Sequence, residues 1–105
     1  MTERARLPNR RPHELFDFEH GGFRFTAGVG RFADGGPAEL FLSSAKVGTD
    51  LAVAASDAAI VVSNALQHGA ALKTIRHALA RNRDGGAAGP IAAALDLLAI
   101  ERAED

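Results

Sequence analysis

Hydrophobic and polar residues alternate along the first half of the chain. The alternation runs through residues 15–20, 23–32 and 37–44, and a period of two is typical of strands that bury one face. Gly21 and Gly22 separate the first two segments, and an Asp-Gly pair at Asp34 separates the second from the third. Because Asp-Gly suits the positive φ angles of primed turns, we predict two tight hairpins and a meander of three antiparallel strands.

The hydrophobic period changes after Gly48. Residues 49–69 are apolar except for a narrow polar line that contains Asp57 and Asn64, a heptad apart. This pattern predicts a long helix that begins at a Thr49 or Asp50 N-cap and ends at a glycine. Since so little of the helix is polar, we expect most of its circumference to be buried, by other helices or by a second chain.

Two shorter helices follow. In residues 72–81 the apolar positions Leu72, Ile75 and Leu79 should face inward and the basic positions outward. Residues 82–89 read as a loop, and Pro90 suits the first turn of a last helix through residue 103, with its main stripe at Ile91, Leu95 and Leu98. The predicted fold is α+β: a three-stranded antiparallel meander followed by three helices packed on one face (β-β-β-α-α-α).

The length of 105 residues corresponds to one domain. We assign residues 13–105 to this domain and residues 1–12 to a flexible basic arm. The arm holds Arg4, Arg6, Arg10 and Arg11 against a single acidic residue. Short charged ends of this kind are usually solvated.

Composition narrows the classes of function. The formal net charge is -1 and the chain has no Tyr or Trp, so we do not expect a nucleic-acid partner. No apolar segment is long enough to span a membrane, and no signal peptide is visible. With no cysteine, the chain has no disulfide, thiolate metal site or thiyl radical. These features favour a cytoplasmic location.

Candidate chemistry is sparse. The four histidines, His13, His20, His68 and His77, show no paired ligand spacing, and His68 suits the C-terminal end of the long helix. No serine lies in a nucleophile elbow. We therefore predict no catalytic residue, no metal ligand and no cofactor site.

Two segments have the composition of binding surfaces. Lys46, Gly48 and Thr49 precede a helix N-terminus, where backbone amides attract anions, so a nucleotide or phosphate is one candidate ligand; a merely capped helix is the alternative. Basic residues of the second helix form a candidate docking face for an acidic partner, with a solvated helix face as its alternative. The residues of this face are Lys73, Arg76, His77 and Arg81.

The chain also resembles a known family. The run VGTDLAVAASDAAIVVSNALQHGAALKTIRHALAR, followed by GPIAAALDLL and preceded by GRFADGGPAELFLSSAK, is similar to the TSCPD domain. That family has a small sheet, a Gly-x-Asp/Thr helix start, a long helix with a Ser-x-x-Leu segment, a glycine stop and a short amphipathic helix. Its members are C-terminal domains of adenosylcobalamin-dependent ribonucleotide reductases and short stand-alone proteins. The Thr-Ser-Cys-Pro-Asp signature of the family is absent here.

The resemblance implies an association with ribonucleotide reduction and no catalysis by this chain alone. We expect an accessory or regulatory module of ribonucleoside-diphosphate reductase that acts through protein contacts. Its partners would be itself, as a homodimer or larger homo-oligomer, and a reductase catalytic subunit. The alternative is a small-molecule binder for a nucleotide or phosphate at Lys46, Gly48 and Thr49. A third reading is a reductase subunit that supplies a regulatory surface to a separately encoded catalytic chain.

Overall fold

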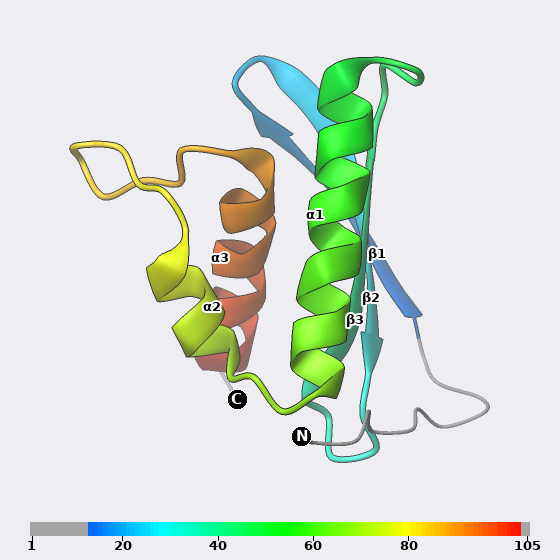
Figure 1. Ribbon diagram of the computed structural model, residues 1–105, viewed down its shortest axis with the longest axis vertical. Helices are drawn as coiled ribbons and strands as arrows, with labels where there is room; N and C mark the ends of the chain where they lie inside the picture. Colours follow the sequence, from blue (N-terminus) through cyan, green and yellow to red (C-terminus); the bar gives the residue numbers. More distant parts are fainter. Residues whose placement is uncertain (1–12, 104–105) are drawn as a thin grey trace.

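The computed structural model describes residues 13–103, so the predicted basic arm at residues 1–12 lies outside the described residues. The elements are β1 (His13–His20), β2 (Phe23–Arg31), β3 (Pro37–Ser44), α1 (Asp50–Gln67), α2 (Leu72–Ala78) and α3 (Pro90–Ala103). The strands form one sheet in the order β1-β2-β3, antiparallel throughout, and the helices cover one of its faces (Figure 1). The predicted α+β class and element order are confirmed.

The face of the sheet toward the helices is apolar. Phe25, Ala27 and Val29 of β2 and Leu40 and Leu42 of β3 are each no more than 3% exposed. They pack with buried residues of α1 and α3 in one core. The alternation of side chains along each strand therefore places one hydrophobic set under the helices, as the sequence pattern predicts.

The two hairpins use different turns. Gly21 and Gly22 both have positive φ, 59° and 82°, as a primed two-residue turn requires. At the second hairpin the prediction of a primed turn is wrong, because Gly35 has a φ of 90° but Asp34 does not have a positive φ. The carboxylate of Asp34 instead accepts a hydrogen bond from the amide of Gly36 at 2.8 Å. This local bond favours the longer loop in which a left-handed glycine follows the turn.

The same turn recurs between α2 and α3. Residues 82–86 end in Asp-Gly-Gly, like residues 32–36. In both segments the fourth residue donates to the first carbonyl at 2.9 Å, and the first amide donates to the fifth carbonyl at 2.8 Å. Arg81 and Ala87 form a β-bridge beneath the second turn. The predicted loop at residues 82–89 thus contains a miniature hairpin.

Helix α1 begins and ends where its caps predict. The Thr49 hydroxyl accepts a hydrogen bond from the Ala52 amide at 3.1 Å, and Gly69, just beyond the helix, has a φ of 96°. Its buried stripe is narrow and consists of Ala55, Ala59, Val62, Leu66 and Gln67. Small side chains in this stripe let the helix approach the sheet closely.

We expected most of the circumference of α1 to be buried, but its outer side is exposed in a single copy of the chain. Val53, Ile60 and Val61 are 56%, 54% and 67% exposed. The sheet and α3 cover only the side of α1 that faces them, and within residues 13–103 no further element covers the other side. A single copy therefore leaves large apolar side chains in water.

Two polar side chains of α1 face inward instead. Strand β3 is an edge strand, and α1 lies against it. The Ser63 hydroxyl accepts from the Leu40 amide at 2.8 Å and lies 3.0 Å from the Leu40 carbonyl oxygen. The Gln67 side chain, 2% exposed, donates to the Ala38 carbonyl at 3.0 Å. These contacts satisfy peptide groups that an edge strand otherwise leaves open, and they block strand addition there.

Helices α2 and α3 complete the core. Leu95 and Leu98 are 0% and 2% exposed, and Leu72, Ile75 and Leu79 pack against the buried cluster as predicted. Helix α2 is shorter than predicted: it ends at Ala78, because Leu79 is extended with φ -83° and ψ 154°. The chain then turns toward α3 and its Arg81 side chain.

Candidate functional site

The predicted anion site before α1 is occupied by internal contacts. Thr49 uses its hydroxyl to cap the helix and also donates to the Lys46 carbonyl at 3.0 Å. The Lys46 ammonium lies 5.3 Å from the centre of the Phe23 ring, a cation–π contact with the first residue of β2. Gly48 has a φ of 83° and shapes the turn. The side chains of Lys46 and Thr49 are thus engaged in separate contacts.

The predicted docking residues of α2 line a groove. This basic groove, of about 540 Å³, lies between the turn at residues 32–36, the C-terminal end of α1, and helix α2. Lys73, Arg76 and His77 line it together, whereas Arg81 does not. Their spacing of three and four residues brings them onto one side of α2. The structure therefore joins three of the four residues of the predicted face.

The remaining wall and floor of the basic groove come from the end of α1, the first residue of α2 and the turn after β2. Leu66 and Leu72 supply apolar surface, as does Phe32 from the turn after β2. Asp34 lies at the opposite rim, where its carboxylate already accepts the amide of Gly36. Phe32 was not predicted as a site residue, because only the tertiary structure brings it beside α2.

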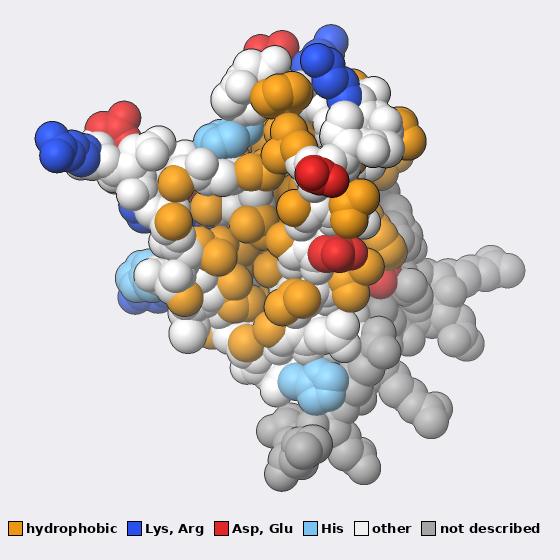
Figure 2. All heavy atoms as spheres, turned by 45° about the horizontal axis from the view of Figure 1, so that its top comes forward, with side chains coloured by type: hydrophobic (Ala, Val, Ile, Leu, Met, Phe, Trp, Pro, Cys, Tyr) orange, Lys and Arg blue, Asp and Glu red, His pale blue; other side chains and the backbone are white. Residues whose placement is uncertain are grey.

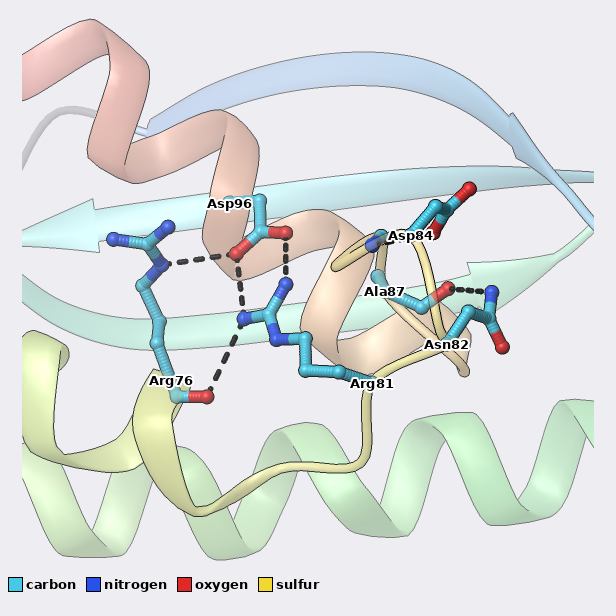
Figure 3. A network of polar contacts seen from close by, with 7 residues as sticks. Arg76, Arg81, Asn82, Asp84, Ala87 and Asp96 are labelled. Atoms are coloured by element: carbon cyan, nitrogen blue, oxygen red, sulfur yellow. Dashed lines mark hydrogen bonds and ion pairs between the residues drawn. The ribbon is translucent and has the colours of Figure 1, made fainter.

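Two arginines share one carboxylate next to this groove (Figure 3). Arg81 contacts both oxygens of Asp96, at 2.5 and 2.9 Å, and Arg76 donates from Nε to Oδ1 at 2.9 Å. Arg81 also donates to the Arg76 carbonyl at 3.3 Å, which satisfies a terminal carbonyl of α2. These contacts fasten α2 and the miniature hairpin to α3.

The electrostatics of this cluster favour the ionised forms. The hydrogen bond from Arg81 is the main cause that lowers the pKa of the Asp96 carboxyl, while partial burial opposes it and a hydrogen bond from Arg76 adds to it. The same contact raises the pKa of Arg81. Since two guanidinium groups face one carboxylate, the cluster keeps a positive charge.

We predicted that Arg76 and Arg81 face outward from an amphipathic helix, but both side chains are partly covered. Their side chains are 29% and 28% exposed because both lean onto Asp96. Asp96 was not predicted as a site residue. One signal was present, since Asp96 is the only charged residue in the apolar run from 91 to 100.

A second groove lies along the edge strand. It encloses about 450 Å³, and no residue that lines it carries a charge. Leu15, Phe41 and Ile60 line it and are 75%, 52% and 54% exposed. We call these three residues the apolar edge. Leu15, Gly28 and Phe41 are in register across the three strands, and the missing side chain at Gly28 lets the two large residues close over it.

Hydrophobic surface is also prominent on the helical side. Figure 2 shows hydrophobic side chains spread over α1 and its surroundings, interrupted by acidic side chains. Val53 and Val61 of α1 contribute to the exposed apolar surface, as does Ile100 of α3 at 57%. Scattered apolar residues are normal on a protein surface, but contiguous ones mark contact sites.

Among the described residues no group of three or more metal-ligating side chains comes together. His68 is the C-cap of α1, with its Nδ1 2.8 Å from the Asn64 carbonyl oxygen. His77 lines the basic groove. The serine that is most engaged, Ser63, bonds to backbone groups and has no histidine partner. The polar contacts found here are thus those of caps, turns and helix docking.

Within residues 13–103, none of the helices combines the length and apolar character needed to cross a bilayer. Comparison with known proteins gives no match to a family model, to a curated protein or to a solved structure.

Proposed function

We propose that this chain is a non-catalytic, TSCPD-like interaction module associated with ribonucleotide reduction, which acts by protein–protein contact. The observation that carries the proposal of a contact function is the apolar edge, where Leu15, Phe41 and Ile60 are at least half exposed around an uncharged groove. The link to a reductase rests on the sequence resemblance. The same proposal places the chain in the cytoplasm.

The residues that carry the resemblance have packing and capping roles. Thr49 caps α1, Ser63 joins α1 to the edge strand, and Leu66 is 5% exposed in the core. Gly69 has the positive φ of a helix stop, and Pro90 begins α3. These roles support a scaffold that presents surfaces.

Self-association is part of the proposal, and the apolar edge is the surface for it. In a two-fold symmetric dimer the same patch meets itself, so a charged patch would repel its copy. The groove along the edge strand avoids this penalty because all its lining residues are neutral. Ser63 and Gln67 occupy the backbone of β3 at Leu40 and Ala38, so the contact would use side chains there rather than strand pairing.

Light scattering during size exclusion tests the dimer. Ile60→Glu should shift the chain toward monomer, because it places a charge in the uncharged groove. Val61→Glu is the matched control, since Val61 is also exposed on α1 but does not line that groove. A wild-type chain that is monomeric at micromolar concentration contradicts self-association, as does an equal effect of the two variants.

Reductase association is tested by titration of the purified catalytic subunit from the same genome. Saturable binding, or a change in the reductase rate, is the expected result. Proximity of the two genes would favour the reading in which this chain is a dedicated regulatory subunit. Failure to bind any reductase subunit, in a chain that is folded by circular dichroism, would remove the association.

The alternative function, nucleotide or phosphate binding before α1, has a separate test. Calorimetry against a nucleotide panel should show binding that Lys46→Ala weakens if this alternative holds. The capping contacts of Thr49 and the contact between Lys46 and Phe23 compete with such a ligand. Absence of binding, or binding unchanged in Lys46→Ala, excludes it.

A further inference from the structure

We infer that the basic groove binds an acidic peptide segment that carries an apolar side chain between acidic residues. The inference rests on the proposed function in one respect, namely that the module works by binding a protein partner. It assigns to this groove a role separate from that of the apolar edge. The occupant is identified by charge and shape alone.

Charge complementarity is the first argument. Lys73, Arg76 and His77 are the basic side chains of one wall, and Asp34 is the acidic lining residue on the other rim. The Asp34 carboxylate already accepts the Gly36 amide. A ligand with carboxylates along the α2 wall therefore gains more favourable contacts than a neutral or cationic one.

Preorganisation is the second argument. Arg76 is held by its Nε–H bond to Asp96, and Figure 3 shows its two terminal nitrogens directed away from that carboxylate. No hydrogen bond joins these two nitrogens to another residue that the structure describes. A guanidinium fixed in this way loses little side-chain entropy when it binds a carboxylate, and its planar group suits bidentate contact.

The apolar floor defines the rest of the ligand. Leu66 is 5% exposed, and Leu72 and Phe32 lie beside it. In an extended peptide, residues i and i+2 lie about 7 Å apart on one side, with residue i+1 on the other. This is close to the spacing of about 5–6 Å between side chains three positions apart on a helix, such as Lys73 and Arg76. An acidic–apolar–acidic sequence thus turns its two carboxylates toward the α2 wall and its apolar side chain toward the opposite side, where Phe32 lies.

The shape of the groove favours a peptide over a small molecule. Its volume of about 540 Å³ is within the range of ligand pockets. However, Lys73, His77 and Asp34 are all exposed, so the groove is open along its length. Pockets for small molecules bury most of the ligand, whereas an open groove with polar walls suits a segment that enters and leaves it.

The test uses the full chain and two fluorescein-labelled peptides. One has the sequence Gly-Ser-Glu-Phe-Glu-Leu-Gly-Ser, and its control has glutamine for each glutamate. Fluorescence polarisation should show saturable binding of the acidic peptide, about tenfold tighter than its control. Nitrogen-15 chemical-shift mapping should place it at Leu72, Lys73 and Phe32.

The variant that decides the matter is Lys73→Ala, because Lys73 is exposed and its side chain makes no hydrogen bond or ion pair with another residue that the structure describes. It should weaken binding about five- to tenfold. Arg83→Ala is the matched control, since Arg83 is an exposed cation of the miniature hairpin that does not line the groove; it should change binding less than about twofold. Added salt should weaken the wild-type complex.

Several results would overturn the inference: equal binding of both peptides, equal effects of the two variants, shifts confined to the apolar edge, or preferential binding of anionic lipid vesicles. The outcomes also separate the inference from the proposed function. If Lys73→Ala binds the reductase as tightly as wild type and the acidic peptide does not bind, only the groove assignment fails. If the acidic peptide binds in the groove and no reductase subunit does, only the proposed function fails.

Discussion

Replacement of Ser63 by alanine tests how α1 is fastened to the edge of the sheet. The Ser63 oxygen accepts from the Leu40 amide at 2.8 Å and lies 3.0 and 2.9 Å from the carbonyl oxygens of Leu40 and Ala59. A hydroxyl has one proton, so these two carbonyls share it. The Leu40 amide donates to this oxygen at the open edge of the sheet, and Ser63→Ala removes that acceptor.

The expected loss follows from the partly buried position of this bond. An unsatisfied buried donor destabilises a protein by about 1–3 kcal/mol, and partial exposure favours the lower half of that range. Alanine is a better helix former than serine by a few tenths of a kcal/mol, which offsets part of the loss. Ser56→Ala, one heptad earlier on an exposed part of α1, makes the same chemical change without the contact. The difference between the two variants should be about 1–2 kcal/mol.

Urea unfolding of both variants measures this difference. In a domain of this size each kcal/mol corresponds to about 4–8 °C in Tm, so Ser63→Ala should unfold several degrees below Ser56→Ala. Hydrogen exchange gives a local readout, because the Leu40 amide should exchange about tenfold faster in Ser63→Ala. Equal stabilities of the two variants, together with unchanged exchange at Leu40, would refute this account of the contact.

The remaining predictions concern the ion cluster, the core and the sheet. Asp96→Asn should destabilise the fold at neutral pH, because arginine hydrogen bonds lower the pKa of the Asp96 carboxyl and so stabilise its ionised form in the folded state. The stability difference between the variant and the wild type should persist above about pH 4 and shrink at lower pH, where the wild-type carboxyl becomes protonated. Thermal unfolding at a series of pH values measures this difference. Leu95→Ala should cost about 2–5 kcal/mol in urea, and Leu97→Ala, 40% exposed in wild type, much less; equal losses would contradict the core assignment. A Cβ at Gly30 would lie 2.5–3.0 Å from side-chain atoms of the buried Glu39 opposite it, so Gly30→Ala should lower the free energy of unfolding by about 1–3 kcal/mol. Gly89→Ala should stay near wild type, because a Cβ at Gly89 would meet open space. Similar melting temperatures of the two variants would refute the clash.

Parts of the candidate site were predictable because their geometry is local. Lys73, Arg76 and His77 share a helix side at spacings of three and four, so sequence alone places them together, and the structure puts all three in one groove. Arg81 was grouped with them because helix α2 was expected to continue to residue 81. The helix ends at Ala78, and Arg81 turns onto Asp96 instead.

Other parts depended on contacts between distant residues. Asp96 lies 15 and 20 positions from its two arginines, and Phe32 reaches the basic groove from the other half of the chain. No periodicity links such pairs. Their partners are chosen by which surfaces meet after α2 and α3 pack on the core.

The sequence by itself determined the elements and their order. Strand alternation, the Thr49 cap and the stop at Gly69 act over a few residues, so each can be recognised before any packing is known. Only the tertiary structure decided which side of α1 faces the sheet. Ser63 and Gln67 turn inward, while Ile60 and its apolar neighbours remain in water. The physical reason is that β3 ends the sheet: its open peptide groups need hydrogen-bond partners, and those partners come from a helix 23 to 29 positions away.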